Sequence, residues 1–228
     1  MFKFTIFTML IFAFSLNLSA QSWANTEKYQ EENKNMGSPG TEEKRVVFMG
    51  NSITEGWSNY MPDFFMQNFY FNRGISGQTT SQMLVRFRPD VIELKPKIVV
   101  ILSGTNDIAE NNGTISLEII MSNIISMAEL AKLNNIDVIL CSVLPAYDYP
   151  WRQGLEPAEK IVKLNQMIKS YANENKLVYV DYFTKMEDGK NGLKSKYTYD
   201  GVHPNFEGYR VMASLVQDAI NKCINKIK

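Results

Sequence analysis

The chain has 228 residues, of which 45% are hydrophobic and 21% are charged, a composition typical of a globular protein with one well-buried core. Lysine and arginine together number 24, and so do aspartate and glutamate, so the formal net charge is zero. This balance provides no bulk field that would attract nucleic acid or an anionic membrane, so we expect neither as a partner.

Residues 1–24 have the layout of a secretory signal peptide. Lys3 precedes an apolar run over about residues 4–16, and small residues follow, with Ala20 and Ala24 as the two candidate cleavage positions. The run is shorter than the roughly 20 residues of a membrane-spanning helix. We therefore expect a secreted or periplasmic protein with no stable membrane insertion after cleavage, and an uncleaved anchor is the alternative.

The stretch after this segment, residues 25–41, is polar and contains the sequence GSPG, which predicts a flexible lead-in. The folded domain is expected over residues 42–228. Its two cysteines, Cys141 in an apolar run and Cys223 on an apolar helical stripe, are both typical of small core residues. A disulfide between them is the less favoured alternative, and two cysteines are too few for a cysteine-ligated metal site.

Apolar runs and helical patterns alternate along the domain. Five short runs predict buried strands at residues 45–50, 69–74, 97–104, 136–143 and 176–182. The third and fourth are nearly continuous in Val, Ile and Leu, as in parallel strands that are covered on both faces. Apolar residues at helical spacing predict helices at residues 115–133, 157–174 and 205–224. The order predicts one α/β domain with a parallel sheet between two helical layers.

Ligands of open α/β sheets bind beyond the carboxyl ends of the strands, so the residues that end each strand are the candidates for a site. Ser52 follows the first strand in GNSIT, Gly77 follows the second in NRGISGQTT, and Asn106 follows the third in SGTND. After the fifth strand, DGVHPN contains Asp200 and His203, which is the only histidine of the chain. Each segment alone is equally typical of a turn or a helix cap.

Together the segments supply the parts of an acyl-transfer site. Ser52 would be the nucleophile and His203 its base, while Asp200 would hold one ring nitrogen as a donor so that the other can accept a proton. The Asn106 amide and the N–H groups of Gly77 and Ser52 would bind the oxyanion of a tetrahedral intermediate.

These segments resemble the conserved blocks of the SGNH (GDSL) hydrolase family. GNSIT resembles the first block, ISGQTT the second, GTND the third and DGVHPN the fifth, and they span residues 50–205 in the family's order. The resemblance implies a serine esterase with Ser52, Asp200 and His203 as the triad. It also implies a three-layer α/β/α sandwich similar to flavodoxin, with no metal and no organic cofactor.

The first block departs from the family pattern at Asn51, where aspartate is common. Asparagine keeps a side-chain oxygen that can accept a turn hydrogen bond but drops the charge, so we expect activity to be retained. The chain also lacks Gly-x-Ser-x-Gly, the motif of the α/β-hydrolases.

Aromatic residues near the predicted site suggest how substrate is bound. The loop at residues 144–157 carries Tyr147, Trp151 and Arg152, and Trp57 follows the nucleophile segment. Their rings could stack on a sugar or line an acyl pocket, and Arg152 could bind a carboxylate or phosphate. The alternative is that the aromatic residues only pack the loop onto the domain.

Export and the absence of a long apolar insertion favour a short acyl group, so the expected substrate is a small-molecule or glycan ester, most simply an O-acetylated carbohydrate. A lysophospholipase or short-chain acyl esterase is the alternative enzyme, and a noncatalytic carbohydrate-binding relative is the alternative from another class. A free imidazole titrates near pH ~6.5, and a carboxylate partner favours its charged form. The sequence therefore predicts activity that rises between about pH 6 and pH 8.

Overall fold

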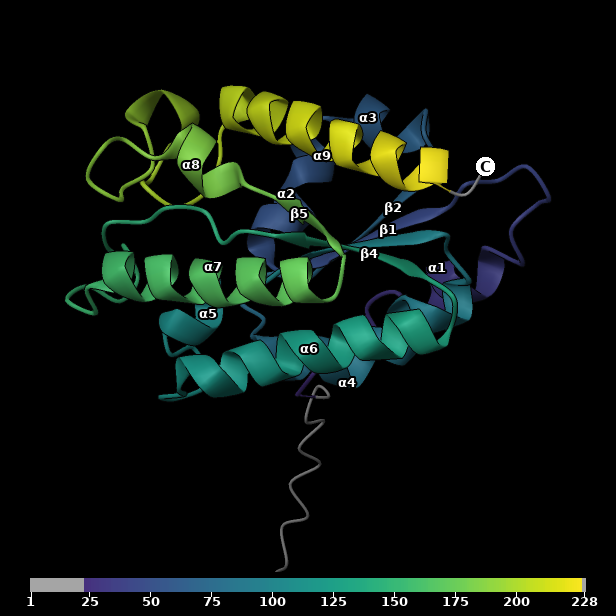
Figure 1. The fold of residues 1–228 in the computed structure, drawn as a ribbon, viewed down its shortest axis with the longest axis horizontal. Helices are drawn as coiled ribbons and strands as arrows, with labels where there is room; N and C mark the ends of the chain where they lie inside the picture. The colour runs from purple at the N-terminus through teal and green to yellow at the C-terminus, as the bar shows by residue number, and fades with distance from the viewer. Residues whose placement is uncertain (1–22, 227–228) are drawn as a thin grey trace, which may run out of the picture.

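The computed structural model describes residues 23–226, so the predicted signal segment up to residue 22 lies outside the described residues. A five-stranded, all-parallel sheet with the order β2-β1-β3-β4-β5 forms the centre (Figure 1). Its strands are β1 (Val46–Gly50), β2 (Tyr70–Gly74), β3 (Ile98–Leu102), β4 (Asp137–Cys141) and β5 (Val178–Val180). From β1 the chain adds β2 on one side of the sheet and then β3, β4 and β5 on the other side. Doubly wound folds bind their ligands at this change of side, between β1 and β3.

The central strands are buried on both faces because helices cover the sheet on both sides. Along β1, Val47 and Met49 contribute to one hydrophobic core, and Val46 and Phe48 contribute to the other. This alternation follows from the two-residue side-chain period of a strand. The predicted α/β/α sandwich with a five-stranded parallel sheet is confirmed.

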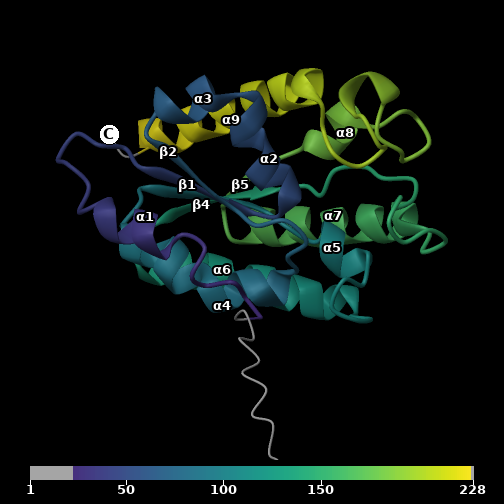
Figure 2. The same ribbon diagram turned by 180° about the vertical axis from the view of Figure 1, so that it is seen from behind.

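Each face of the sheet has its own set of helices (Figures 1 and 2). One core includes residues of α4 (Thr80–Asp90), α5 (Thr105–Ile108), α6 (Leu117–Leu133) and α7 (Pro157–Glu174). The other core includes residues of α2 (Ser52–Tyr60), α3 (Pro62–Met66), α8 (Tyr182–Met186) and α9 (Phe206–Lys226). Two short 3-10 helices, η1 (Ile92–Leu94) and η2 (Ser195–Tyr197), lie in the connections.

The segment at residues 25–41 is not the flexible lead-in that its composition predicts. It forms helix α1 (Gln30–Asn35), which lies beside α4 (Figure 2). The Asn33 amide donates to the Asp90 carboxylate at 2.8 Å, and Glu32 pairs with Arg73 at 3.0 Å. Polar contacts therefore hold this segment to the domain. Such contacts produce no periodic pattern of hydrophobic residues, so the sequence did not predict them.

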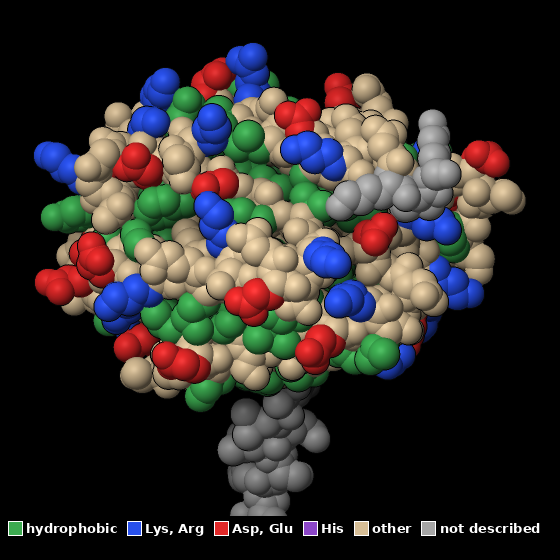
Figure 3. Space-filling view, viewed as in Figure 1, with side chains coloured by type: hydrophobic (Ala, Val, Ile, Leu, Met, Phe, Trp, Pro, Cys, Tyr) green, Lys and Arg blue, Asp and Glu red, His purple; other side chains and the backbone are tan. Residues whose placement is uncertain are grey.

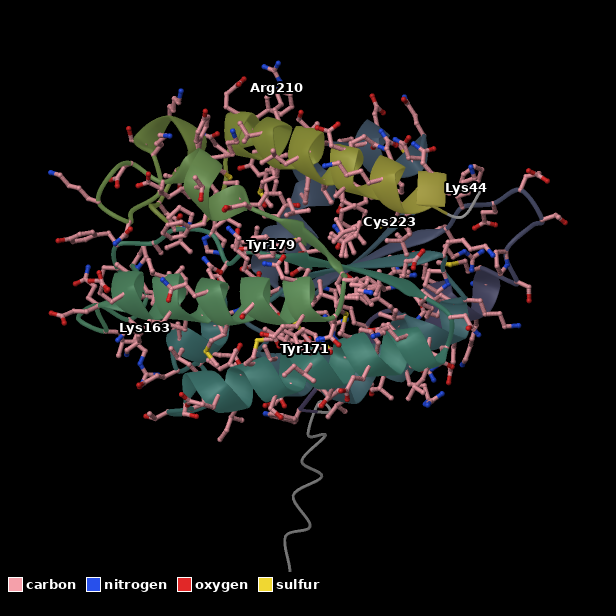
Figure 4. The ribbon with its side chains drawn as sticks, viewed as in Figure 1. Lys44, Lys163, Tyr171, Tyr179, Arg210 and Cys223 are labelled. Atoms are coloured by element: carbon pink, nitrogen blue, oxygen red, sulfur yellow. The ribbon has the colours of Figure 1, made fainter. Side chains whose placement is uncertain are left out.

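Cys141 and Cys223 are both buried in the core on the α9 side of the sheet, and they form no disulfide. Figure 4 shows Cys223 on α9, across the sheet from Tyr171 on α7. The sequence-based preference for two small core residues is therefore confirmed.

The visible surface carries Lys and Arg side chains interspersed with Asp and Glu, with no field of one sign on this face (Figure 3). Within residues 23–226, no helix has the length and apolar character needed to cross a membrane. The same part of the chain contains no cluster of His, Cys, Asp and Glu that could hold a metal ion.

Candidate active site

Ser52 lies at the carboxyl end of β1, where it is the first residue of helix α2. The preceding residue, Asn51, caps the helix because its side-chain oxygen accepts a hydrogen bond from the Ile53 N–H at 3.0 Å. A neutral amide oxygen is sufficient for this role, so the loss of the family's aspartate leaves the turn intact. The Ser52 hydroxyl, in turn, is available for a contact outside its own helix.

That contact is made by the only histidine of the chain. Ser52 Oγ lies 2.9 Å from His203 Nε2, although the two residues are 151 positions apart in the sequence. The other ring nitrogen, Nδ1, lies 2.7 Å from Asp200 Oδ2. With Nδ1 donating to the carboxylate, Nε2 carries a free lone pair and can accept the serine proton.

Asp200 and His203 are held in one tight turn before α9. The second carboxylate oxygen of Asp200 accepts from the backbone N–H groups of Val202, at 2.9 Å, and of His203, at 2.7 Å. Thr198 donates its hydroxyl to the His203 carbonyl at 2.7 Å. The Tyr209 hydroxyl then ties α9 to α2 by donating to the Ile53 carbonyl at 2.9 Å, so both partners share one rigid support.

These hydrogen bonds also determine the charge of the carboxylate. Burial raises the pKa of Asp200, but the hydrogen bonds from the His203 N–H, the His203 ring and the Val202 N–H together outweigh burial and place the pKa below its ordinary range. The carboxylate therefore stays ionised near neutral pH, and it can stabilise an imidazolium.

Two of the predicted oxyanion donors lie on α5 and on the loop after β2. Asn106 is buried, and its side-chain amide donates to the Gln78 carbonyl at 3.0 Å, which joins α5 to the loop after β2. Gly77 has a φ of +78°, a left-handed conformation that favours glycine. The hydrogen bonds described for residues 23–226 give the Gly77 N–H no acceptor, so this donor is available to a ligand.

A close backbone approach brings the loop after β2 against the nucleophile turn. The Ile75 N–H donates to the Gly50 carbonyl at 3.1 Å. A Cβ atom added at Gly74 would lie 2.2 Å from the Glu55 backbone nitrogen and 2.8 Å from the Asn51 carbonyl oxygen, distances that no side chain can occupy. Gly74 thus permits the start of the loop that carries Gly77 to pack against the turn of Ser52.

Sequence reasoning missed Arg86, a fully buried arginine of α4. Its guanidinium donates to the Gly50 carbonyl at 3.0 Å and to the Gln78 side-chain oxygen at 2.5 Å, and it pairs with Asp90 at 2.9 Å. It therefore bridges the residue that ends β1 and the loop that carries Gly77. Its position on the buried face of α4, beside Met83, Phe87 and Asp90, is the signal that could have identified it.

Sequence reasoning also missed Asn111, which the loop composition around it gave no reason to single out. Its amide donates to the Gly77 carbonyl at 3.2 Å, and its oxygen accepts from the Trp151 indole N–H at 3.2 Å. One exposed side chain thus connects the oxyanion loop to the aromatic loop at residues 144–157.

A sequence profile of the GDSL-like lipase/acylhydrolase family matches residues 48–211, which is most of the chain. The chain belongs to this family. A GDSL-like lipase from Bacteroides thetaiotaomicron has a similar crystal structure, with a TM-score of 0.86 and 53% identity over 87% of this chain and 98% of that one.

Two curated relatives of this GDSL-like protein are esterases. It is 25% identical to an acetylxylan esterase of Xylanibacter ruminicola over 82% of this chain and 45% of that protein. It is 26% identical to the esterase TesA of Pseudomonas aeruginosa over 68% of this chain and 73% of that protein. The chain spans about half the length of some of its curated relatives, the acetylxylan esterase among them.

Trp57 is not a substrate-binding residue of this GDSL-like protein, and that prediction is wrong. Its side chain is only 1% exposed. The indole stacks on Phe64, with ring centroids 5.5 Å apart, and on Tyr209, at 5.6 Å. Helical geometry explains the error, because Trp57 lies five positions after Ser52 and turns towards α3 and α9 instead of the strand ends.

The other predicted substrate-binding residues are exposed on the loop after β4. The Trp151 ring lies 5.7 Å from the His203 ring, so this side chain adjoins the reacting groups. Tyr147 is exposed and lines a small cavity of about 290 Å³ together with Asp200 and Gly201. Arg152 pairs with the Glu110 carboxylate at 3.2 Å and donates to the Glu110 carbonyl at 2.7 Å, so its charge is already countered.

Proposed function

We propose that this GDSL-like protein is a secreted serine esterase that removes acetyl groups from O-acetylated carbohydrates. The observation that carries the proposal is the pair of contacts at the imidazole, 2.9 Å to Ser52 Oγ and 2.7 Å to Asp200. A binding protein has no use for a hydroxyl and a base at this distance, because their joint effect is to make the hydroxyl a nucleophile.

In the first half of the reaction, Ser52 Oγ attacks the ester carbonyl carbon while its proton moves to His203 Nε2. The carbonyl oxygen becomes an oxyanion, which the Ser52 N–H, the Gly77 N–H and the Asn106 amide stabilise. As the tetrahedral intermediate collapses, the bond to the sugar oxygen breaks and that oxygen takes the proton from Nε2. The products are the free sugar hydroxyl and an acetyl-Ser52 ester.

The second half repeats these steps with water. The imidazole removes a proton from a water molecule, whose oxygen attacks the acetyl carbonyl, and the same donors stabilise the second oxyanion. Collapse breaks the bond to Ser52 Oγ, which recovers its proton from Nε2, and acetate is released. No electrons are transferred, so the cycle needs no redox cofactor.

The choice of an acetylated carbohydrate rests on the relatives and on the rim of the site. The acetylxylan esterase that resembles this chain is named for such a substrate. Exposed aromatic side chains, among them Trp151, suit the flat faces of sugar rings. The proposal that the protein is exported rests on the sequence of residues 1–24, and it fits a substrate that is found outside the cell.

The proposal is tested with 4-nitrophenyl acetate, butyrate and octanoate, followed by acetate release from acetylated xylan, with Ser52→Ala as the control. We expect the fastest turnover with acetate and none above background in the variant. Preference for octanoate would favour a lipase-like esterase. Equal rates for wild type and Ser52→Ala would contradict hydrolysis altogether and favour a carbohydrate-binding role.

A further inference from the structure

The residues just before helix α1 lie against the loop that carries the oxyanion donor. The Trp23 carbonyl accepts a hydrogen bond from the Gln82 amide at 2.6 Å, and the Ala24 carbonyl accepts one from the Gln78 amide at 2.6 Å. Ala24 is buried, whereas the Trp23 side chain is 55% exposed. The backbone is therefore fixed while the indole remains open to a ligand.

Trp23 is part of a cleft of about 570 Å³, a volume in the range of small-molecule sites. The cleft is also lined by the loop after β2, including Gly77 and Gln78, and by the aromatic loop, with Trp151 and Arg152. One further side chain of the N-terminal segment, one of α4 and two of the segment after α5 complete the described lining. The Trp151 ring is the neighbour of the imidazole, at 5.7 Å. The cleft is therefore lined by the oxyanion-donor residue Gly77 and by the aromatic ring next to the base.

The side chains along this cleft fit a neutral, hydroxyl-rich ligand. Two indoles and several amides line it, including those of Asn25, Gln78 and Asn112, and Ile75 is the only aliphatic residue of the described lining. A fatty acyl chain would need an aliphatic wall. Arg152 is the only charged side chain in the described lining, and Glu110 already neutralises it.

We infer that Trp23 is a specificity residue that stacks on a sugar ring of the acetylated glycan, and that the exported protein keeps Trp23 because its leader is cleaved after Ala20 and not after Ala24. This inference rests on the proposed esterase function. It corrects the expected boundary at residue 24, since the last two residues of that segment belong to the folded domain.

Cleavage after Ala24 would carry a structural cost at the site itself. The Gln78 side chain is 3% exposed, and its amide would lose the Ala24 carbonyl, leaving a buried donor unpaired. The same residue accepts from Asn106 through its backbone carbonyl and from Arg86 through its side-chain oxygen. A cut at Ala24 would therefore disturb the oxyanion loop as well as remove the indole.

The first test is the intact mass of the full chain after export by a bacterial host with its own leader. We expect a first residue of Gln21, which supports the inference. Any other first residue overturns the cleavage position, and a first residue of Ala24 or later also overturns the role of Trp23, whether or not the protein is an esterase.

The second test compares Trp23→Ala and Trp23→Phe with the wild type on acetylated xylo-oligosaccharides and on 4-nitrophenyl acetate. We expect Trp23→Ala to lower kcat/KM for the oligosaccharide about tenfold more than for the small ester, mostly through KM, and Trp23→Phe to restore most of the difference. Leu133→Ala, which removes an exposed apolar side chain at the end of α6, is the matched control.

Equal losses on both substrates, or no loss in Trp23→Ala, would overturn the role of Trp23 while leaving the esterase proposal standing. If the wild type hydrolyses neither ester, the esterase proposal fails by itself. Calorimetric binding of unacetylated xylo-oligosaccharide to the wild type and to Trp23→Ala then decides the role of Trp23, since weaker binding to the variant supports it and equal binding overturns it.

Discussion

Two regions at the same edge of the sheet are built in opposite ways. Around the imidazole, hydrogen bonds between 2.7 and 2.9 Å connect Ser52, His203 and Asp200, and buried Arg86 and Asn106 hold the adjoining loops. The rim that Trp23 and Trp151 provide consists of exposed rings with few polar contacts. The difference indicates that the reacting groups are preorganised, whereas the rim can change with little effect on the fold.

The comparison predicts how substitutions in each region should change the kinetic constants. Changes in the hydrogen-bonded region should lower kcat, because preorganised donors act mainly on the transition state. Changes in the rim should raise KM, because stacking contributes equally to the bound substrate and to the transition state.

The largest effect is expected from His203→Ala, which removes the base. We expect kcat for 4-nitrophenyl acetate to fall by about 10⁵-fold, the scale of losses when one member of a triad is removed. The control is Tyr199→Ala, whose exposed ring stacks on the imidazole at 5.9 Å without bonding to it. A comparable loss in the control would mean that ring packing, and not proton transfer, accounts for the role of His203.

Asn106→Ala should give the next largest effect. Removing one oxyanion donor typically costs about 10²- to 10³-fold in kcat, and we expect KM to change little. Steady-state kinetics of this variant are compared with those of Asn134→Ala, an exposed asparagine at the end of α6 that belongs to neither region and serves as the control. A rise in KM without a fall in kcat would place Asn106 in substrate binding instead.

The pH dependence tests whether the carboxylate stays charged. Because the pKa of Asp200 is lowered, the contribution of its charged form is fully present above the unfolded value of about 4 and is lost only as the pH falls through the lower folded value. A single protonation should therefore control the acid limb. We expect log kcat/KM to rise with a slope of one between about pH 4.5 and the plateau.

A slope of two on that limb would show that Asp200 and His203 take up protons together. The measurement needs a stability check at each pH, since a slope that follows unfolding would report on the fold and not on the base. Circular dichroism of the same samples provides it.

The smallest effect on activity is expected from Trp151→Ala, which should raise KM for an acetylated oligosaccharide about fivefold and lower the free energy of unfolding by less than about 1 kcal/mol. Trp57→Ala should instead lower the free energy of unfolding by about 3–5 kcal/mol, because a large buried indole leaves a cavity. Urea unfolding of both variants tests this difference, and equal losses of stability would show that the rim residue Trp151 contributes as much to the fold as a buried core residue.

The sequence by itself determined the five strands, the longer helices and the order of the segments that follow the strands. Strand and helix periodicity are local, so the runs that became β3 and α7 could be identified without any long-range contact. The fold class then placed Ser52 and His203 at one edge of the sheet, because parallel strands put their carboxyl ends together.

Only the tertiary structure decided which of the remaining residues belong to the site. Whether Trp57 is buried, whether Trp23 faces a cleft and whether Arg86 bridges two loops all depend on contacts between segments distant in the sequence. Such contacts leave no periodic pattern, because the sequence around a single polar or aromatic residue does not show whether its side chain is buried or exposed. Burial and hydrogen bonding are properties of the packed chain, and they appear only when its elements are brought together.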